Sequence, residues 1–349
     1  MLKTALDFEK PIAELDAQID AIQDHMQGEG LRQWCREHGR DYDAEIATLE
    51  QGLERLRRDR ARLMEDIFSH LSPWEKTQVA RHKERPHTAD IIRLIAGDFF
   101  ELHGDRRFAD DAAIMGGLAR IGNHDVLLIG HEKGRDLKDK VRRNYGSARP
   151  EGYRKAIRLM KLAERAGRPV VSIVDTSAAD SSVGAEERGI SEAIADAMEE
   201  MAVLRVPIVV VVLGEGGSGG AIGIGVGDRI LMMEHAVYSV IPPEGCANIL
   251  WRDGARADEA ADALKLTAQD ALRLRVIDEI LPEPLGGAHR APEAAAATIR
   301  DAVLQALDTL GSLSPDALVE ERYRKFRGMG QWTEAPAPDA LEPVTAPAA

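Results

Sequence analysis

The chain has 349 residues, 44% hydrophobic and 30% charged, as is usual for a soluble protein with one large domain or two modest ones. Its formal net charge of -14 argues against broad binding to nucleic acid or a membrane surface. No apolar run approaches the roughly 20 residues of a membrane span, and the N-terminus lacks a signal-peptide core, so we expect a cytoplasmic location. With 2 cysteines, a disulfide framework and a four-cysteine zinc site are excluded.

The first 72 residues have the apolar spacing of helices. Apolar side chains repeat at helical intervals from Ile12 to Ile22 and again from Ile46 to Leu63, with polar, glycine-containing segments between them. We expect a helical hairpin without chemistry of its own, lying on the main domain or on a partner subunit. After a linker marked by Pro73 and Pro86, a further helix is expected from Thr88.

Strands and helices alternate through the middle of the chain. We expect strands at 113–122, 125–130, 169–175, 206–212, 229–233 and 236–241, and helices at 153–166 and 185–204. This order predicts an α/β fold with a mostly parallel sheet and crossover helices. From about Asp258 the chain should return to helices, with one short strand at 276–281, and the proline- and alanine-rich tail from Thr333 should be disordered.

Two loops of small residues follow strands of this sheet. One is the glycine-rich stretch from Gly214 to Gly227, and the other runs from Asp175 to Gly184. Ligands bind at the carboxyl ends of parallel strands, so two helix N-termini could line one pocket here. Backbone N–H groups at such a turn can stabilise developing negative charge. A tightly packed strand–helix corner is the alternative, and the spacing fits neither common nucleotide-binding loop.

These and other motifs, in this order, resemble the α subunit family of bacterial acetyl-coenzyme A carboxylase carboxyltransferase. The resemblance runs from about Leu6 to Gly330 and is more specific than any single glycine-rich loop. The motifs that carry it are Leu6-Asp-Phe-Glu-Lys-Pro-Ile-Ala-Glu-Leu15, Lys133-Gly-Arg135, Arg142-Arg-Asn-Tyr-Gly146, Pro150-Glu-Gly-Tyr-Arg-Lys155, Val183-Gly-Ala-Glu-Glu-Arg-Gly189, Gly214-Glu-Gly-Gly-Ser-Gly-Gly-Ala221, Tyr238-Ser-Val-Ile241, Pro243-Glu-Gly-Cys-Ala247 and Pro282-Glu-Pro-Leu-Gly-Gly-Ala-His289.

The resemblance implies a crotonase-like fold of ββα units. It implies a helical region at 1–72, a carboxyltransferase domain at 73–315, and a C-terminal helix end with a disordered tail at 316–349. The implied reaction moves a carboxyl group from carboxybiotin on a carrier protein to acetyl-coenzyme A. The product is malonyl-coenzyme A, in the first committed step of fatty acid biosynthesis.

The resemblance also implies the partners. They are a β subunit in an α2β2 complex, the biotin carboxyl carrier protein and biotin carboxylase, with no membrane and no nucleic acid. No covalently bound cofactor and no metal are expected in this chain, because the family's zinc ribbon belongs to β. The family is associated with ATP binding as well.

Within the site, the resemblance assigns Gly216 and Gly217 as backbone donors to the biotin-side oxyanion. Ser218, Gly219 and Gly220 would shape the turn, and Thr176 and Gly184 would complete the biotin-binding side. No side-chain base is required, because the ureido anion of biotin can remove the proton itself. Four basic residues could contact phosphates or a partner, or form a solvated or salt-bridged face: Lys133, Arg135, Arg142 and Arg143. His289 is expected to be structural and Glu244 to lie in a turn near the site.

The loop after the first of these strands departs from the family pattern. Members usually have Asp-Thr-Pro-Gly-Ala-Tyr-Pro-Gly, whereas this chain has Asp175-Thr-Ser-Ala-Ala-Asp-Ser-Ser182. Loss of two prolines should loosen the loop. If a missing glycine needed positive φ, Ala178 or Ser182 would be strained, and Asp180 would put a carboxylate near the forming anion. Two further hypotheses therefore stay open: a carboxyltransferase or decarboxylase for another acyl-coenzyme A, and a non-catalytic assembly subunit.

Overall fold

The computed structural model describes residues 5–330 of the chain. The tail that the sequence predicts to be disordered from Thr333 lies outside these residues. Among the helices of the described part, none is both long enough and apolar enough to cross a membrane.

The described residues build one eight-stranded sheet in the order β1-β2-β3-β4-β5-β6-β8, with β7 added beside the end of β5. The first three strands are antiparallel to one another, and every pairing from β3 onward is parallel. The predicted α/β class and mostly parallel sheet are therefore confirmed. The strands are β1 (Phe99–Glu101), β2 (Ile114–Ile121), β3 (His124–His131), β4 (Val170–Thr176), β5 (Ile208–Gly217), β6 (Arg229–Met233), β7 (Val237–Ser239) and β8 (Glu279–Leu281).

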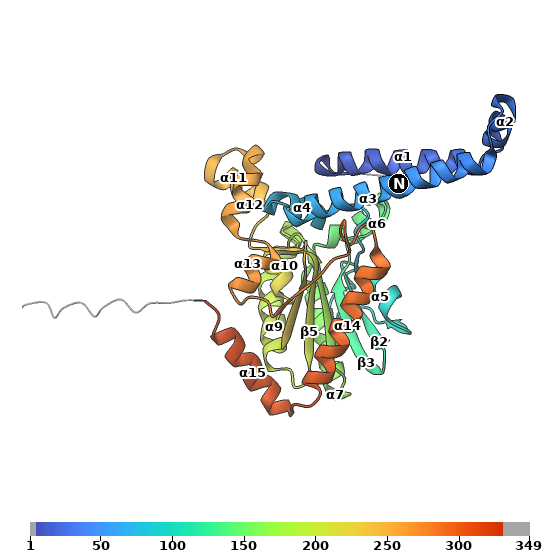
Figure 1. The fold of residues 1–349 in the computed structure, drawn as a ribbon. Helices are drawn as coiled ribbons and strands as arrows, with labels where there is room; N and C mark the ends of the chain where they lie inside the picture. Colours follow the sequence, from blue (N-terminus) through green and yellow to red (C-terminus); the bar gives the residue numbers. More distant parts are fainter. Residues whose placement is uncertain (1–4, 331–349) are drawn as a thin grey trace, which may run out of the picture.

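Helices connect the strands and cover both faces of the sheet (Figure 1). They are α1 (Lys10–Gln27), α2 (Glu29–His38), α3 (Tyr42–Ser69), α4 (Pro73–Ala80), α5 (Thr88–Ile95), α6 (Leu137–Arg142), α7 (Pro150–Arg165), α8 (Val183–Glu187), α9 (Ile190–Val203), α10 (Ser218–Ile222), α11 (Pro243–Trp251), α12 (Ala257–Leu264), α13 (Ala268–Arg273), α14 (Pro292–Leu310) and α15 (Pro315–Arg327). Short 3-10 turns lie at Asp7–Glu9, Asn144–Gly146 and Gly254–Arg256.

The core lies between the central strands and these helices. Every residue of β4 is buried, and so is β5 up to Gly216. Continuous Val and Ile runs of this kind fit a parallel sheet that is covered on both faces. Helices α7 and α9 pack against each other, and α14 packs against β5, β8 and α5. The last helix, α15, joins the same core through Leu318.

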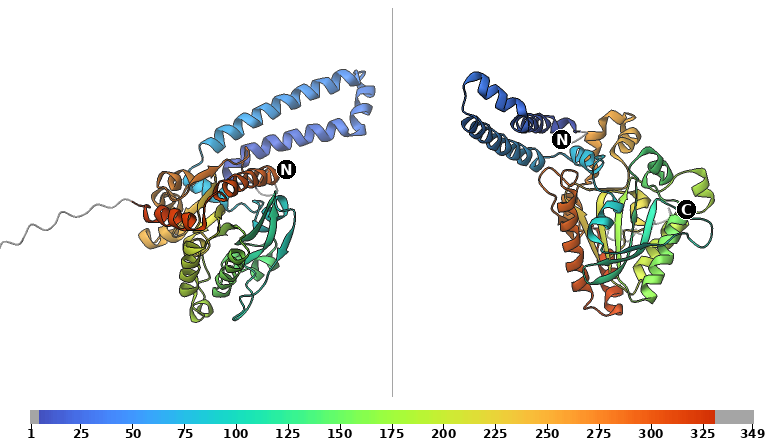
Figure 2. Two further views of the ribbon diagram at one scale, coloured as in Figure 1. Left: turned by 90° about the horizontal axis from the view of Figure 1, so that it is seen from below. Right: turned by 90° about the vertical axis from the view of Figure 1, so that its right-hand side faces the viewer.

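The predicted N-terminal helical hairpin is confirmed and is formed by α1 and α3, with α2 at its tip. The base of the hairpin packs on the body, while the tip lies away from it (Figure 2). A separate small core fills the base, made of Ile12, Met64, Phe68, Leu71 and Val79. Helix α4 then begins with a capping box in which Ser72 and Glu75 each bond the other's backbone N–H, with proline at the first helical position.

The structure corrects several predicted boundaries. Strand β5 does not end at Val212 but continues through Gly217, so the first part of the glycine-rich stretch is strand. The helix expected over 185–204 is broken at Gly189, which adopts φ 77, and becomes α8 and α9. The strands expected at 236–241 and 276–281 are shorter, because only Val237–Ser239 and Glu279–Leu281 pair with neighbours.

Candidate functional site

The glycine-rich stretch meets the neighbouring loop at the carboxyl ends of β4 and β5. Gly216 is paired on one side with Thr176 of β4 and on the other with Tyr238 of β7. Gly217 in turn pairs with Ser239 of β7. The sequence prediction that the two small-residue loops lie side by side is therefore confirmed. Gly216 and Gly217 themselves belong to strand β5, and helix α10 begins directly after them at Ser218.

Close packing explains why no side chain fits at several of these glycines. A Cβ on Gly217 would lie 1.9 Å from the carbonyl oxygen of Ser177, and one on Gly216 would lie 2.0 Å from the Tyr238 ring. A Cβ on Gly220 would lie 2.6 Å from the carbonyl carbon of Ala178. Gly219 is less constrained, because its nearest contact would be 3.3 Å from Ile194 Cδ1. Close packing therefore requires glycine at Gly216, Gly217 and Gly220, whether or not their backbone N–H groups also bind a ligand.

The turn into α10 is strained at Ser218. This residue adopts φ 51, in the left-handed region that side chains rarely occupy. Helix α10 has only five residues, so the helix that was expected to aim its N-terminus at a ligand is a single short turn. Backbone strain of this kind costs energy and tends to persist where function requires it.

The altered loop is held by its own polar groups. The Thr176 hydroxyl donates to the Ala178 carbonyl at 2.8 Å and accepts from its N–H at 3.3 Å. Asp180 accepts a hydrogen bond from Arg149 Nε at 3.2 Å and another from the Ser182 N–H at 2.9 Å. Neither Ala178 nor Ser182 has positive φ, so the strain that the missing glycines suggested is absent at both positions.

A small cavity of about 20 Å³ lies directly against the paired glycines. A volume of this size holds roughly one water molecule, or a group of similar bulk, and not a ring. The strand ends contribute Ser177, Gly216 and Gly217 to its wall. Glu215 of β5 also lines it, and the remaining lining residues come from other segments: Arg81, Val237, Ser239, Ile241, Pro242, Pro243 and Leu266.

Two of the lining residues, Arg81 and Glu215, belong to a connected set of charged side chains, here called the site network: Arg81, Lys133, Asp175, Glu215 and Glu244. Lys133 Nζ lies 2.8 Å from both Asp175 and Glu215. Arg81 Nε donates to Glu215 Oε1 at 2.7 Å, and its Nη1 donates to Glu244 Oε1 at 2.6 Å. The backbone N–H of Glu215 also donates to Asp175 at 3.0 Å. The network thus ties β3, β4 and β5 to α11 across the site.

Three members of the network, Lys133, Asp175 and Glu215, stay charged at neutral pH. Burial by itself would raise the pKa of Asp175, but Lys133 beside it holds that pKa below its usual value. Glu215 behaves in the same way, with Lys133 and Arg81 opposing the effect of burial on its pKa. For Lys133, the two carboxylates outweigh burial and raise its pKa. The glycine turn is therefore supported by fixed charges of both signs.

His131 lies beside the site network and was not singled out from the sequence. It ends β3 and is fully buried, and the Gly220 backbone is the hydrogen-bonding group that acts on its ring. Burial, together with the positive charge of Lys133, lowers its pKa to about 4, and Asp175 opposes that change only in part. The ring is therefore neutral at physiological pH. A histidine immediately before Glu132-Lys133 was the only available signal, and burial cannot be read from it.

The basic residues singled out from the sequence do not form one exposed face. Lys133 belongs to the site network, and Arg135 donates to the carbonyls of Lys83 and Arg85. Arg142 and Arg143 both bond Asp139. The expectation of a solvated or intersubunit face was wrong for Lys133, because its ammonium group is buried and paired within the chain.

Gly184 lies in α8, where a Cβ would meet Arg188 Nη1 at 3.1 Å. It is not among the residues that line the small cavity, and neither are Thr176, Ser218, Gly219 and Gly220. Glu244 does lie beside the site, as predicted, in the first turn of α11. Arg81 and Glu215 were missed, although an acid inside a run of glycines was a visible signal.

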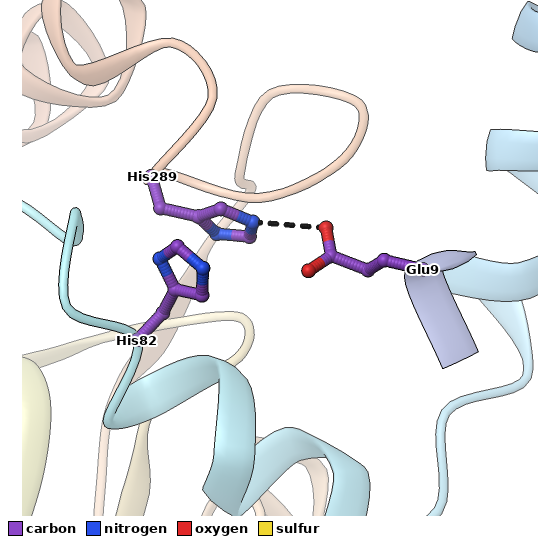
Figure 3. Close-up of side chains that lie close together, drawn as sticks. All are labelled: Glu9, His82 and His289. Atoms are coloured by element: carbon purple, nitrogen blue, oxygen red, sulfur yellow. Dashed lines mark hydrogen bonds and ion pairs between the residues drawn. The ribbon is translucent and has the colours of Figure 1, made fainter. Parts of the chain in front are cut away.

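One group in the described part of the chain has the composition of a metal site: Glu9, His82 and His289, all buried (Figure 3). His289 Nε2 lies 3.1 Å from Glu9 Oε1, and the His82 and His289 rings are 4.1 Å apart. The same Glu9 oxygen also accepts from Arg290 at 3.1 Å, so a cation already lies beside it. We therefore interpret this group as a structural contact that joins Glu9, at the base of the hairpin, to His289 and Arg290 of the body. This agrees with the structural role expected for His289.

Comparisons with known proteins place the chain in a family. The profile of the family described as acetyl co-enzyme A carboxylase carboxyltransferase-like matches residues 5–330. The chain belongs to this family. A protein of Thioalkalivibrio sulfidiphilus named acetyl-coenzyme A carboxylase carboxyl transferase subunit alpha is 51% identical over 94% of this chain and 98% of its own length. A protein of the same name from Sphingopyxis alaskensis is 52% identical over 93% of this chain and 98% of its own.

Solved structures with the same fold are carboxyl-transferring and decarboxylating enzymes. Transcarboxylase 12S matches with a TM-score of 0.54 and 18% identity, over 76% of this chain and 47% of that one. A Pseudomonas malonate decarboxylase hetero-dimer also reaches 0.54 at 18% identity, over 68% of this chain and 94% of that one. At this identity the likeness concerns the fold alone. The expected crotonase-like fold is confirmed.

Proposed function

We propose that this chain is the carboxyltransferase α subunit of an acetyl-coenzyme A carboxylase. Together with a β subunit, it transfers the carboxyl group of carboxybiotin to acetyl-coenzyme A, giving malonyl-coenzyme A for fatty acid biosynthesis. The observation that carries this function is the paired glycine turn at the ends of β4 and β5, in a chain whose family match spans residues 5–330.

The reaction balances without a side-chain base. The bond between the biotin ureido nitrogen and the carboxyl carbon breaks, releasing carbon dioxide and leaving the electron pair on the ureido group. That anion takes a proton from the acetyl methyl group, and the resulting enolate attacks the carbon dioxide. Negative charge builds on the ureido oxygen and then on the thioester oxygen, so fixed N–H donors at both positions lower the barrier.

We assign the biotin-side donors to the backbone of Gly216 and Gly217. Their position is fixed by β4 and β7 on either side and by Glu215 of the site network immediately before them. Preorganised donors need no rearrangement when charge develops. Ser218, Gly219 and Gly220 shape the turn that follows. Thr176 and Gly184 act indirectly, through the loop and helix that they order, since the Thr176 hydroxyl is engaged within its own loop.

The partners follow from the reaction. A β subunit binds the coenzyme A thioester, in an α2β2 assembly, and carboxybiotin arrives as a substrate on a biotin carboxyl carrier protein after biotin carboxylase has used ATP. Exposed apolar side chains near the site support a protein partner there: Val183 is 75% exposed, Val240 73% and Ile249 72%. A cytoplasmic location, the domain limits 1–72, 73–315 and 316–349, and the absence of a metal remain predictions.

The altered loop keeps one second function open, namely carboxyl transfer or decarboxylation with another acyl-coenzyme A. Asp180 and Ser181 stand where an aromatic residue and a proline are usual, next to the strand end that carries Thr176. A change of this kind beside a substrate site is a reasonable origin of altered acyl specificity.

One assay distinguishes these functions. The chain is purified with its cognate β subunit, and carboxylation of biocytin is followed with malonyl-coenzyme A as the carboxyl donor. Turnover with malonyl-coenzyme A supports the proposed function. Turnover only with a branched or longer acyl group supports the second, and a stable complex without turnover with any donor contradicts both and indicates an assembly subunit.

A further inference from the structure

We propose that Arg81 is the group that binds the transferred carboxylate, and that Glu244 occupies its place until substrate arrives. This inference rests on the proposed function of the glycine turn. It concerns Arg81 and Glu244 of the site network, which have so far been described only as structural supports of the site.

The first observation is the position of Arg81. Its side chain lines the small cavity together with Gly216 and Gly217, and it is 28% exposed. Its Nε is held by Glu215, which belongs to the same strand as the glycines. The guanidinium group is therefore fixed to the strand that would hold the ureido group. Its planar set of donors suits a carboxylate better than a point charge would.

The second observation is the poor fit of its other partner. Glu244 offers Oε1 to Arg81 at 2.6 Å, but its Oε2 is buried and has no hydrogen-bond partner within residues 5–330. The side chain as a whole is 42% exposed, in contrast to 10% for Glu215. A buried oxygen without a donor costs free energy. Glu244 is therefore the partner of Arg81 that an incoming carboxylate can displace toward solvent.

The third observation is the size of the cavity. About 20 Å³ is room for roughly one water molecule, so the biotin ring would lie outside the cavity and only the tip of a small group, such as one oxygen of a carboxylate, would enter it. Both carboxybiotin and malonyl-coenzyme A carry such a group, and it is the group that the reaction moves. Both substrates would therefore place a carboxylate beside Gly216 and Gly217.

Exchange of partners also suits the reaction. When the substrate carboxylate loses its bond to nitrogen or carbon, it becomes neutral carbon dioxide and no longer holds Arg81. Glu244 can then return, so the Arg81–Glu244 ion pair stabilises the state in which carbon dioxide is free. An arginine without such a second partner would instead favour the bound carboxylate and oppose its release.

The test compares ligands with and without the carboxylate. In the complex with the β subunit, the KM of malonyl-coenzyme A is measured with biocytin as acceptor, and acetyl-coenzyme A is measured as a competitive inhibitor. For Arg81→Gln we expect the KM of malonyl-coenzyme A to rise about 10- to 100-fold, as for loss of a hydrogen bond between charged groups. The inhibition constant of acetyl-coenzyme A should change less than about twofold, and Arg81→Lys should recover part of the loss.

Glu244→Gln should act in the opposite direction. Without the competing carboxylate, the KM of malonyl-coenzyme A should fall several-fold, while turnover slows because carbon dioxide release is no longer assisted. Arg256→Gln serves as the matched control for Arg81→Gln, because it removes an arginine paired with a glutamate, Glu259 on α12, outside the site. This control should leave both constants unchanged.

Two results would overturn the inference. One is an equal loss of malonyl- and acetyl-coenzyme A affinity in Arg81→Gln, which would mean that Arg81 only supports the strand. The other is an unchanged or higher KM in Glu244→Gln. If Arg81→Gln does not assemble with the β subunit, the Glu244→Gln result decides alone. Absence of turnover in the unmodified complex would instead contradict the proposed function.

Discussion

Arg81 and Arg85 lie close together between α4 and α5 and both bind strand β5, yet their surroundings differ. Arg85 is almost fully buried, and its Nη1 and Nη2 donate to the two carboxylate oxygens of Glu283 at 2.9 and 2.6 Å. Its Nε and Nη2 also bond the Leu213 carbonyl. Arg81 is partly exposed and forms ion pairs with both Glu215 and Glu244, and one carboxylate oxygen of Glu244 has no hydrogen-bond partner among the described residues.

This difference separates a structural ion pair from one that is available to a ligand. The Arg85 pair has a partner for each charged group, so any exchange would leave a charge buried and unpaired. The Arg81 pair with Glu244 already contains an unpaired oxygen and reaches solvent. Two arginines that bond to the same strand can thus differ in role: Arg85 holds β5 in place, and Arg81 is available to a substrate.

Breaking the Arg85 pair should have the largest effect on stability. We expect Glu283→Gln to lower the free energy of unfolding by about 3–5 kcal/mol, since a buried arginine loses its charged partner. Urea denaturation of the purified chain measures this. Glu244→Gln is the matched comparison and should cost far less. Equal losses in the two variants would mean that the two arginines do not differ in the way described.

Gly217 tests whether the end of the strand held by both arginines takes part in catalysis. We expect Gly217→Ala to reduce turnover in the complex by about 10²–10³, the usual cost of losing one oxyanion donor. A Cβ at this position meets the Ser177 carbonyl oxygen at 1.9 Å, so the strand or the loop must shift. In Gly219→Ala the new Cβ meets only Ile194 Cδ1, at 3.3 Å, so a small shift of that side-chain end accommodates it and the variant should retain activity. If Gly217→Ala assembles with β and keeps the normal rate, the donor assignment is wrong.

His131, below the same strand ends, should make stability depend on pH. Its pKa is about 4 in the folded chain against 6.5 when exposed, so only the unfolded state gains a proton as pH falls between these values. We expect a loss of about 2 kcal/mol between pH 6.5 and pH 5 from this residue. The depressed pKa of Glu283, about 2, affects stability only at lower pH. Urea denaturation of His131→Gln should show a correspondingly flatter pH profile, and an identical profile would contradict this account.

Much of the fold could be predicted because local patterns and burial agree. Helical spacing identified the hairpin, and the continuous Val and Ile runs of β4 and β5 identified the centre of the sheet. The end of β5 was predicted too early, because pairing with β7 keeps Gly216 and Gly217 in strand conformation. That pairing depends on residues far along the chain, and glycine itself favours neither outcome.

The charged part of the site could not be predicted in the same way. Lys133, Glu215 and Arg81 are far apart in the sequence and meet only once the sheet has formed. An isolated charge usually indicates an exposed position, so Lys133 was interpreted as a surface residue. The glycines were found from sequence because their effect is local. The charged residues were not found from the sequence, because the role of each depends on which oppositely charged side chains the fold brings beside it.

Asp180 in the altered loop provides the test with the smallest expected effect. The sequence suggested that its carboxylate would oppose anion formation, but in the structure Arg149 offsets that charge. We therefore expect Asp180→Asn to change turnover of the complex less than about twofold, since Arg149 already offsets the charge and an asparagine oxygen can still accept from the Ser182 N–H. Arg149→Gln should leave Asp180 unpaired and reduce turnover more. A large gain in activity for Asp180→Asn would show that Arg149 does not offset the charge of Asp180. The loop would then hold a second carboxylate that is poorly matched, beside Glu244 with its unpaired Oε2.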